Sequence, residues 1–385
     1  MDQTMNERVC AEINLDHARM NMQALCREAA PAEVMAVVKA NGYGHGAVDC
    51  GRAFVEGGAT WLAVATVDEA IELQDAGIDA KILILSLVEE PRETDALSRG
   101  FRVVVGDTAT GRRLATKAKQ LGIQAPVHLK LDTGMSRIGF DARTDASEQI
   151  RQLVQETHDS LSYEGLMTHF ACSDADDRSI TDEQYERFHS VRTELQQHGI
   201  DPPIAHVCNS AATLRFPEYH LDLVRVGLIA YGMSRSNTSL AGIKPVMTFV
   251  SRVAYVKNLE SHRGIGYGHT AVTDEPRRIA TVSVGYADGY KRALGGRSHV
   301  SIHGTRYPVV GRICMDALMV DVGPALPEGV AGPVQAGDRV LLWGESGGEQ
   351  VPVEELAAQL DTIPYELVCG VSARVPRHTK RAKST

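Results

Sequence analysis

The chain has 385 residues, of which 43% are hydrophobic and 23% charged, and its formal net charge at pH 7 is −9. This composition is that of an ordinary globular protein, and the length favours one large domain together with a smaller one. Binding to nucleic acid requires a basic face, so the negative charge argues against a nucleic-acid partner.

The cysteines and histidines point to neither a disulfide framework nor a metal site. The seven cysteines include no CxxC pair, and no HExxH motif occurs among the fourteen histidines. The N-terminal segment MDQTMNERVCAEI lacks the apolar region of a signal peptide, and no apolar run approaches the roughly 20 residues of a membrane helix. We therefore expect a cytoplasmic protein with no metal and no membrane partner.

The first part of the chain alternates between strand-like and helical patterns. A short strand is expected over 8–14, followed by a helix over 17–30 with Asp16 as its N-cap. Capping residues also precede later helices, as at Thr66 and at Asp107 or Thr108. The apolar runs expected to form strands are 34–38, 61–65, 82–85, 101–105, 127–131, 163–168, 204–207 and 223–226.

This alternation over 11–240 predicts an α/β fold, a TIM (β/α)8 barrel. A doubly wound sheet is the alternative, but no GxGxxG follows the first strand. Active sites of TIM barrels lie on the loops after the strands. The residues at these strand ends, which we expect to share one site, are Lys39, Arg137, His169, Asn209, Ser210, Arg225 and Gly227.

From residue 241 onwards the pattern changes to β-rich alternation interrupted by glycine-containing turns. The strand-like segments are VSRVAYVKNL, RIATVSVGYADG, RYPVVGRICMDALMVDVG and DRVLLWGE. The range 241–385 is therefore expected to form a second, β-rich domain.

The segment from Val34 to Gly46, VMAVVKANGYGHG, carries the most distinctive chemistry. It predicts a buried strand that delivers Lys39 into a glycine-rich turn. Desolvation lowers the pKa of a lysine, which favours imine formation. A single lysine here would also be explained as an ordinary residue at a strand edge, whose aliphatic stem packs against the protein. The three glycines after Lys39, however, let the backbone approach a ligand closely.

KANGYGHG resembles the motif of the alanine racemase family in which the lysine holds pyridoxal 5'-phosphate (PLP) as a Schiff base. The resemblance extends over about residues 11–376, with the further motifs DTGMSRIG at 132–139, NSAA at 209–212, VRVGL at 224–228 and RICMD at 312–316. It implies a homodimeric, PLP-dependent racemase that interconverts L- and D-alanine and supplies D-alanine for peptidoglycan. The family also implies that the N-terminal strand, within residues 1–14, joins the β-rich domain.

The resemblance implies roles for the cofactor-binding residues. Arg225 would face the pyridine nitrogen, and an arginine, with a pKa above about 12, does not give up a proton to it. The ring is then a weaker electron sink than one paired with a carboxylate, so the Cα proton returns before transamination competes. The NSAA segment could bind the cofactor phosphate, but an ordinary N-cap at the start of a helix would explain the same residues equally well. The residues that would surround the phosphate are Tyr43, Asn209, Ser210, Gly227, Leu228 and Tyr365.

Two bases on opposite faces of the substrate are also implied, Lys39 and Tyr267. By analogy His169 hydrogen-bonds Tyr267 and connects it to Arg225. Lys39 and Tyr267 belong to different predicted domains, and the family solves this problem with a head-to-tail dimer that shares its active sites. The phenol needs activation, because a group with a pKa of about 10 is rarely ionised at pH 7.

The remaining implied residues shape the substrate pocket. Arg137 would bind the substrate carboxylate or the phenolic oxygen of the cofactor through its bidentate fork. Lys130 matches a lysine that is carbamylated in some members, and an unmodified lysine remains the alternative. Met315 and Asp316 would reach the same pocket. Tyr286, together with Tyr365, would narrow the entrance and favour a small side chain such as that of alanine.

Three other functions fit parts of the pattern. A racemase of broader specificity has the same motifs, because pocket width depends on loops that sequence does not place. A basic amino-acid decarboxylase of this fold pairs the pyridine nitrogen with a glutamate, where this chain has Arg225. A non-enzymatic PLP-binding homeostasis protein has a similar barrel but lacks the β-rich domain and Tyr267.

Overall fold

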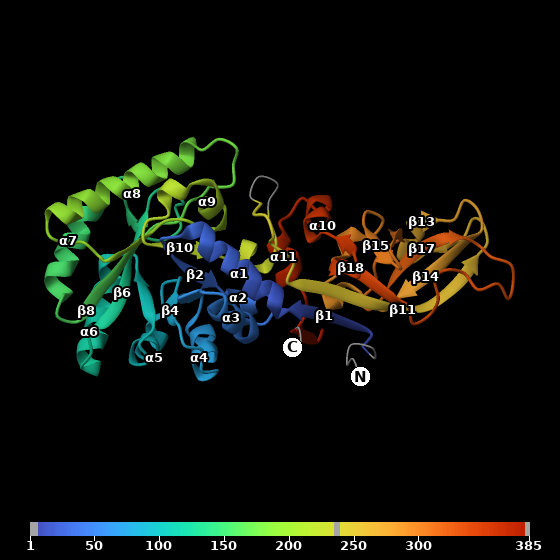
Figure 1. The fold of residues 1–385 in the computed structure, drawn as a ribbon, viewed down its shortest axis with the longest axis horizontal. Coiled ribbons are helices and arrows are strands. Elements are labelled where there is room, and N and C mark those ends of the chain that lie inside the picture. Colours follow the sequence, from blue (N-terminus) through green and yellow to red (C-terminus); the bar gives the residue numbers. More distant parts are fainter. Residues whose placement is uncertain (1–6, 235–238, 382–385) are drawn as a thin grey trace. The chain divides into compact units, whose positions relative to one another are not determined.

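The computed structural model describes residues 7–234 and 239–381, which form two compact units (Figure 1). Within these residues, one unit comprises 18–42 and 47–243, and the other comprises 7–17, 43–46 and 244–381. Residues 1–6, 235–238 and 382–385, which fall inside the predicted domain ranges, lie outside the described part.

The larger unit is a nearly closed barrel of parallel strands surrounded by helices, so the predicted TIM barrel is confirmed. Strand β10 pairs with β2, and pairing continues in chain order to β9. Backbone hydrogen bonds of 3.1 Å, from Asp222 to Ala205 and from Arg225 to Cys208, connect the β9 and β10 segments. The barrel strands are β2 (Glu33–Val37), β3 (Trp61–Val64), β4 (Lys81–Ile84), β5 (Arg102–Val105), β6 (Ala125–Asp132), β8 (Leu161–Met167), β9 (Ile204–His206) and β10 (Leu223–Val226).

The barrel strands were recognisable because their two faces are both covered. In β3 and β10 every residue is buried, and in β2 and β5 only the first residue is not. Parallel strands of this kind have continuous apolar sequences, because one face packs in the barrel interior and the other packs against the helices. A two-residue strand, β7 (Phe140–Asp141), pairs with the end of β6.

Most helices begin where the capping signals indicate. Thr66 and Glu69 form a capping box, and Asp107 accepts a hydrogen bond from the backbone N–H of Thr110. The prediction of Asp16 as an N-cap is wrong: Asn14 Oδ1 accepts from the backbone N–H of the third helical residue at 3.0 Å. The helices are α1 (Leu15–Ala29), α2 (Lys39–Tyr43), α3 (Ala47–Glu56), α4 (Val67–Asp75), α5 (Glu93–Ser98), α6 (Thr108–Leu121), α7 (Ala146–Thr157), α8 (Ser179–Gln197) and α9 (Ser210–Arg215).

The second unit is built around a β-sheet that closes on itself. The strands β11, β14, β17, β16, β15 and β18 pair in this order, and β18 pairs again with β11. Strand β1 (Val9–Asn14) pairs antiparallel with β11, and β20 (Arg377–Lys380) pairs parallel with β1. The other elements are β11 (Met247–Leu259), β12 (Gly264–Ile265), β13 (Ala271–Val272), β14 (Arg277–Val282), β15 (His299–Ile302), β16 (Thr305–Val310), β17 (Leu318–Pro324), β18 (Arg339–Ser346), β19 (Glu349–Val351), α10 (Val353–Gln359) and α11 (Pro364–Cys369).

Within 7–234 and 239–381, no helix combines the length and the apolar character that crossing a membrane requires.

Candidate active site

Lys39 follows strand β2 and begins a turn that winds in the left-handed sense. Ala40 and Asn41 both have φ of 53°, Gly42 has 60°, and Tyr43 follows at 51°. A left-handed turn costs roughly 1–2 kcal/mol for each residue that has a Cβ. Backbone strain of this kind clusters at functional sites, where the surrounding structure must hold it.

Three hydrogen bonds within the barrel unit hold this turn. The backbone N–H of Gly42 donates to the carbonyl of Val38 at 2.8 Å, and that of Ala47 donates to Asn41 Oδ1 at 2.9 Å. The backbone N–H of Ala40 donates to a carboxylate oxygen of Glu69 at 2.7 Å. Asparagine tolerates the left-handed region better than most residues, and here its side chain also caps the start of α3. These contacts fix where Lys39 leaves the strand.

The loop after β6, which carries Arg137, is organised by Asp132. One oxygen of its carboxylate accepts hydrogen bonds from the backbone N–H groups of residues 134–136 at 2.9 to 3.0 Å. A Cβ on Gly139 would lie 2.6 Å from the backbone nitrogen of Asp132, so only glycine lets the end of the loop pass this close to Asp132. The side chain of Arg137 is exposed on this loop.

Arg225 is buried in β10 and uses both terminal nitrogens inside the protein. Nη1 donates to the carbonyl and to Nδ1 of His206, both at 2.9 Å. Nη2 donates to the carbonyls of Thr168 and Val207 at 2.7 and 3.0 Å, and lies 3.3 Å from His169 Nδ1. Among the described residues, Nε has no hydrogen-bond partner. Nε is thus the donor that remains for a ligand.

Two further histidines belong to this network, and neither was expected from the sequence. His206 Nε2 lies 2.8 Å from His128 Nδ1, and both side chains are fully buried. Burial, followed for His206 by the nearby Arg225, lowers the pKa of each imidazole, so both are neutral at neutral pH. The available signal was the position of His206 at the end of β9, shortly before the NSAA segment at 209–212.

The predicted phosphate-binding residues Asn209, Ser210 and Gly227 lie together where β9 and β10 end. Ser210 Oγ accepts a hydrogen bond from the backbone N–H of Gly227 at 2.8 Å. Asn209 is the N-cap of α9, since its Oδ1 accepts from the backbone N–H of Ala212 at 3.0 Å and from Ser173 Oγ at 2.8 Å. Asn209 therefore shapes the turn, while the hydroxyl of Ser210 and the nearby backbone present the polar groups.

Positive charge dominates the C-terminal ends of the barrel strands. Burial, reinforced by Arg225 and Arg137, lowers the pKa of Lys130 to about 7. Burial, together with Arg225, Lys130, Arg137 and Lys39, holds the pKa of His169 well below its usual value. Lys130 and His169 therefore lie within electrostatic range of these cations, and His169 Nδ1 is 3.3 Å from Arg225 Nη2. Such a cluster favours a ligand that carries several negative charges, as a phosphate ester with a carboxylate does.

In the second unit, the loops that carry Tyr286 and Met315 are joined directly. The backbone N–H of Tyr286 donates to the carbonyl of Cys314, and that of Ala287 donates to the carbonyl of Met315, both at 3.1 Å. A Cβ on Gly285 would lie 2.2 Å from the Met315 carbonyl oxygen, so the two loops can lie this close together only with glycine at position 285. Tyr286 and Met315 are 42% and 52% exposed, which leaves both available to a partner or ligand.

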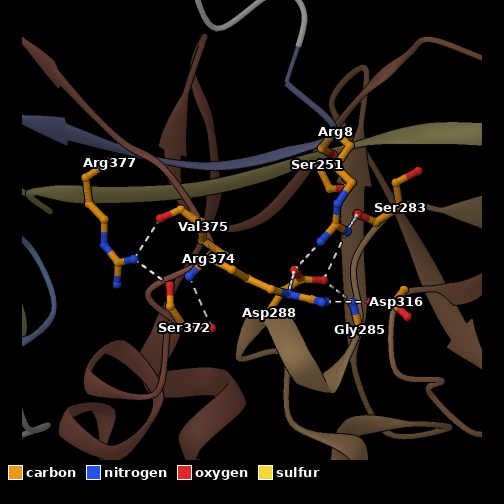
Figure 2. Close-up of polar contacts among 10 residues, drawn as sticks. All are labelled: Arg8, Ser251, Ser283, Gly285, Asp288, Asp316, Ser372, Arg374, Val375 and Arg377. Carbon is orange, nitrogen blue, oxygen red and sulfur yellow. Dashed lines mark hydrogen bonds and ion pairs between the residues drawn. The ribbon is translucent and has the colours of Figure 1, made fainter.

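A buried carboxylate anchors these loops (Figure 2). Asp288 accepts from Arg8 at 2.5 Å, from Arg374 Nε at 2.8 Å and from the backbone N–H of Gly285 at 2.9 Å. Arg374 also donates to Asp316 at 2.6 Å. Burial alone would raise the pKa of Asp288, but these hydrogen bonds outweigh it and the pKa is lowered. Arg374 thus connects the Tyr286 loop to the loop of Met315 and Asp316.

Tyr267 and the pair Tyr43 and Tyr365 lie in other parts of the same unit. Tyr267 is 70% exposed, in a turn beside Arg312: a Cβ on Gly268 would lie 3.2 Å from Arg312 Nη1. The rings of Tyr43 and Tyr365 are 5.4 Å apart between centroids. Burial and then Tyr365 raise the pKa of Tyr43, so its hydroxyl stays protonated and can donate a hydrogen bond.

The candidate residues therefore form two sets. The barrel unit gathers Lys39, Lys130, Arg137, His169, Asn209, Ser210, Arg225, Gly227 and Leu228, and the second unit carries Tyr43, Tyr267, Tyr286, Met315, Asp316 and Tyr365. The expected contact between His169 and Tyr267 involves both sets and stays a prediction. In the described part of the chain, no three His, Cys, Asp or Glu side chains are grouped as metal ligands would be.

Comparison with known proteins identifies the family. Residues 13–235 match the N-terminal domain of alanine racemase, and residues 246–379 match its C-terminal domain. An alanine racemase of Symbiobacterium thermophilum is 43% identical over 369 residues, which are 95% of this chain and 96% of that protein. The alanine racemase from D-cycloserine-producing Streptomyces lavendulae has a TM-score of 0.90 at 36% identity, with 97% of each chain covered.

A more distant solved structure adds a cofactor to the comparison. The alanine racemase from Bartonella henselae, with covalently bound pyridoxal phosphate, has a TM-score of 0.87 at 25% identity, covering 97% of this chain and 100% of that one. Both domain models and relatives of nearly equal length thus indicate the same family. The chain belongs to the alanine racemase family.

Proposed function

We propose that this protein is an isomerase, a PLP-dependent alanine racemase that interconverts L-alanine and D-alanine and supplies D-alanine for peptidoglycan. The observation that carries the proposal is the cluster of Lys39, Arg137, His169 and Arg225 at the ends of the barrel strands. It combines a lysine for covalent attachment with guanidinium groups for the anionic parts of cofactor and substrate. Family membership over nearly the whole chain supports the same reaction.

The polar groups at the barrel strand ends suit PLP. When bound, PLP supplies an electron-withdrawing ring that acidifies the Cα–H of an amino acid attached to it. Lys39 Nζ would hold the cofactor covalently, and Arg225 Nε would face its pyridine nitrogen. The groups that would bind its phosphate are Ser210 Oγ, the backbone N–H groups of Gly227 and Leu228, and the hydroxyls of Tyr43 and Tyr365, with Asn209 capping the helix behind them.

Arg225 accounts for reaction specificity. Burial lowers the pKa of its guanidinium to about 10, so the group remains charged at neutral pH and keeps its protons. Arg225 would therefore donate a hydrogen bond to the ring nitrogen without protonating it, which would limit how far the cofactor draws electrons from Cα. This would favour return of the proton to Cα, and so racemisation, over transamination.

Lys39 Nζ and Tyr267 Oη are the proposed bases. Each would act on its own face of Cα, taking the proton from one enantiomer while the other base delivers a proton to the opposite face. His169 supports the phenolate: because Arg225 donates towards His169 Nδ1, the single proton of the neutral imidazole belongs on Nε2. An Nε2–H that donates to Tyr267 Oη would stabilise the phenolate.

Lys130 is a candidate for carbamylation. Its pKa of about 7 leaves much of the amine neutral, which is the form that adds CO2 with loss of a proton. The resulting carbamate would place a negative charge beside Arg137 and orient its guanidinium. A carbamate signal from 13C-bicarbonate that persists in Lys130→Met would contradict this assignment.

The loops of the second unit would select the substrate. We assign the substrate carboxylate to Arg137 and to the backbone N–H of Met315, with Asp316 nearby and Tyr286 narrowing the entrance. Tyr267, Tyr286 and Met315 are all exposed in the single chain, which supports their burial in a head-to-tail homodimer with shared active sites. Sedimentation of the PLP-loaded protein as a monomer at assay concentration would contradict the dimer.

We place the protein in the cytoplasm. All seven cysteines lie in the described part of the chain and are free thiols, as a reducing compartment favours. Recovery of the native protein from a cell envelope fraction would contradict this assignment.

The test is racemisation by the purified, PLP-loaded protein, with L-alanine, L-serine and L-lysine as separate substrates and chiral chromatography as the measurement. We expect alanine turnover to exceed that of the other two. Comparable turnover of lysine would favour a racemase of broad specificity, and bound PLP without any turnover would favour a PLP-binding protein.

A further inference from the structure

A column of buried side chains extends from Arg225 through the barrel interior to Glu164. Arg225 Nη1 lies 2.9 Å from His206 Nδ1, and His206 Nε2 lies 2.8 Å from His128 Nδ1. The remaining nitrogen, His128 Nε2, is buried and has no hydrogen-bond partner among the described residues. It lies 3.7 Å from a carboxylate oxygen of Glu164, which is an electrostatic contact and too long for a hydrogen bond.

One direction of the protons in this column satisfies every hydrogen bond. An arginine nitrogen is always a donor, so in this arrangement His206 Nδ1 accepts and the proton of that neutral imidazole is on Nε2. His206 Nε2–H then donates to His128 Nδ1, and the proton of His128 must be on its own Nε2. The last N–H of the column therefore faces the carboxylate of Glu164. A reversed column would place an N–H of His206 against an N–H of Arg225.

The local backbone is built to bring Glu164 and His128 together. The register between β6 and β8 shifts after the pair Val127 and Tyr163, so that His128 pairs with Gly165 and Glu164 is the extra residue. Such a bulge re-aims a side chain relative to its neighbours. A Cβ on Gly165 would lie 2.3 Å from His128 Nδ1, so glycine makes the space that the imidazole occupies.

Glu164 retains its charge in this position. Arg102 Nε donates to it at 2.9 Å, and Lys81 Nζ lies 3.7 Å away. Burial opposes ionisation, but His128 and Arg102 outweigh it and lower the pKa of Glu164 to about 2. The side chain is 18% exposed, so its charge acts on His128 with limited screening by water.

We propose that Glu164 is a positioning residue for the racemisation site, which it reaches through His128 and His206. Its carboxylate stabilises the one proton arrangement in which His206 Nδ1 accepts from Arg225. Arg225 is then held by its terminal nitrogens, and Nε is left for the ligand. The inference rests on the proposed function of Arg225 as the partner of the cofactor ring.

The test is Glu164→Gln, which keeps the size of the side chain and removes its charge. We expect kcat for alanine to fall about tenfold while KM changes by less than about twofold, the size usual for coupled neighbours in a network. In PLP-loaded protein labelled with 15N-histidine, the His206 resonances should move from a single tautomer, protonated on Nε2, towards a mixture.

Glu33→Gln is the matched control. Glu33 begins β2 and accepts from Trp61 Nε1 at 2.8 Å, and no hydrogen bond or ion pair connects it to a histidine. This substitution removes a carboxylate near the start of a barrel strand but should leave kcat and the His206 resonances unchanged. The same loss of kcat in both variants would overturn the proposal, because it would show a general effect on the barrel.

A double-mutant cycle with His128→Phe tests the route of the effect. If Glu164 acts through His128, then Glu164→Gln should lower kcat in the wild-type background and have no further effect when His128 is phenylalanine. Equal losses in both backgrounds, or unaltered His206 resonances in Glu164→Gln, would refute the column. Failure of the wild type to racemise alanine would instead refute the proposed function, and the resonances would still test the column.

Discussion

At the scale of single residues, the site depends on one buried guanidinium whose hydrogen bonds are nearly all made within the protein. Both terminal nitrogens of Arg225 have acceptors on β9 and on the segments that follow β8 and β9. Hydrogen bonds to charged groups contribute about 1.5–3 kcal/mol each, which offsets the cost of burying the charge. A lysine has three donors and no planar fork, so it cannot replace this arrangement.

Lys39→Ala should remove the covalent attachment of PLP, since Nζ is the only group proposed to form that bond. We expect the visible absorbance of the cofactor to disappear after desalting and racemisation to fall below detection. Lys119→Ala, a substitution near the end of α6, is the control and should leave both unchanged. Retention of the visible band by Lys39→Ala would show that another lysine holds the cofactor.

Lys130 gives a pH dependence of known sign. Its pKa is about 7 in the folded protein against 10.5 for the unperturbed group, so burial of the ammonium destabilises the fold most strongly below pH 7. Between pH 7 and 10.5 the unfolded state binds the extra proton, and the stability of the wild type relative to Lys130→Met should rise by at most about 1.4 kcal/mol per pH unit.

The measurement is urea unfolding of cofactor-free wild type and Lys130→Met at pH 6, 8 and 9.5, in buffer without CO2. The advantage of Lys130→Met should be greatest at pH 6 and smallest at pH 9.5. A difference in free energy of unfolding that does not vary with pH would contradict the lowered pKa.

At the scale of elements, functional side chains lie on turns that buried polar groups hold from behind. Asp132 fixes the loop of Arg137 through three backbone N–H groups, and Asp288 fixes the loop of Tyr286 through two arginines. In both cases the anchoring carboxylate is buried while the side chain on the loop is exposed. The position of the exposed residue is therefore sensitive to a residue that does not contact the ligand.

Arg374→Gln tests this arrangement in the second unit. Asp288 would keep Arg8, but Asp316 would lose its partner and the two loops would lose their side-chain connection. We expect the free energy of unfolding to fall and KM for alanine to rise several-fold, with a smaller change in kcat.

Arg306→Gln is the control for this substitution, because it breaks an ion pair in the same unit whose carboxylate, that of Glu355, is partly exposed and not buried as Asp288 is. Such pairs contribute about 0–1 kcal/mol, so neither stability nor KM should change much. Equal KM values for Arg374→Gln and the wild type would show that Arg374 does not position the substrate loops.

The elements were largely predictable from sequence, and the connections between them were not. The eight barrel strands read as apolar runs because both faces are covered, and the Thr66 and Asp107 caps have clear local signals. Asp16 was expected as the N-cap where Asn14 caps the helix, because cap position is ambiguous within two residues when both side chains are suitable. His128 joins the network only because β6, β8 and β9 lie side by side, which no local pattern encodes.

The candidate site was likewise predictable from sequence only in part. Lys39, Arg137, His169 and Arg225 were expected together because barrel strands end at one face. After burial, the charges of the three cations contribute to lowering the pKa of His169. The left-handed turn after Lys39 was not expected, since Ala40 and Tyr43 rarely adopt such a backbone. Local propensity fails there because the contacts of Asn41 and Gly42 override it.

At the scale of the whole molecule, the proposal requires residues from two chains. Lys39→Ala and Tyr267→Phe can be co-expressed with different tags, so that a heterodimer carrying one copy of each is purified. If Lys39 of one chain works with Tyr267 of the other, one of the two sites is intact, and about half of the wild-type specific activity should return. A heterodimer as inactive as either variant alone would place the complete site within one chain.

The most direct test of the account is hydrogen exchange at Cα in D2O, with L-alanine and D-alanine in separate reactions and NMR or mass spectrometry as the readout. The wild type should incorporate deuterium from both enantiomers while racemising each. Tyr267→Phe should still bind PLP, should lose racemisation, and should retain exchange from one enantiomer only, because Lys39 still serves one face. Full racemisation by Tyr267→Phe in both directions would contradict the two-base mechanism.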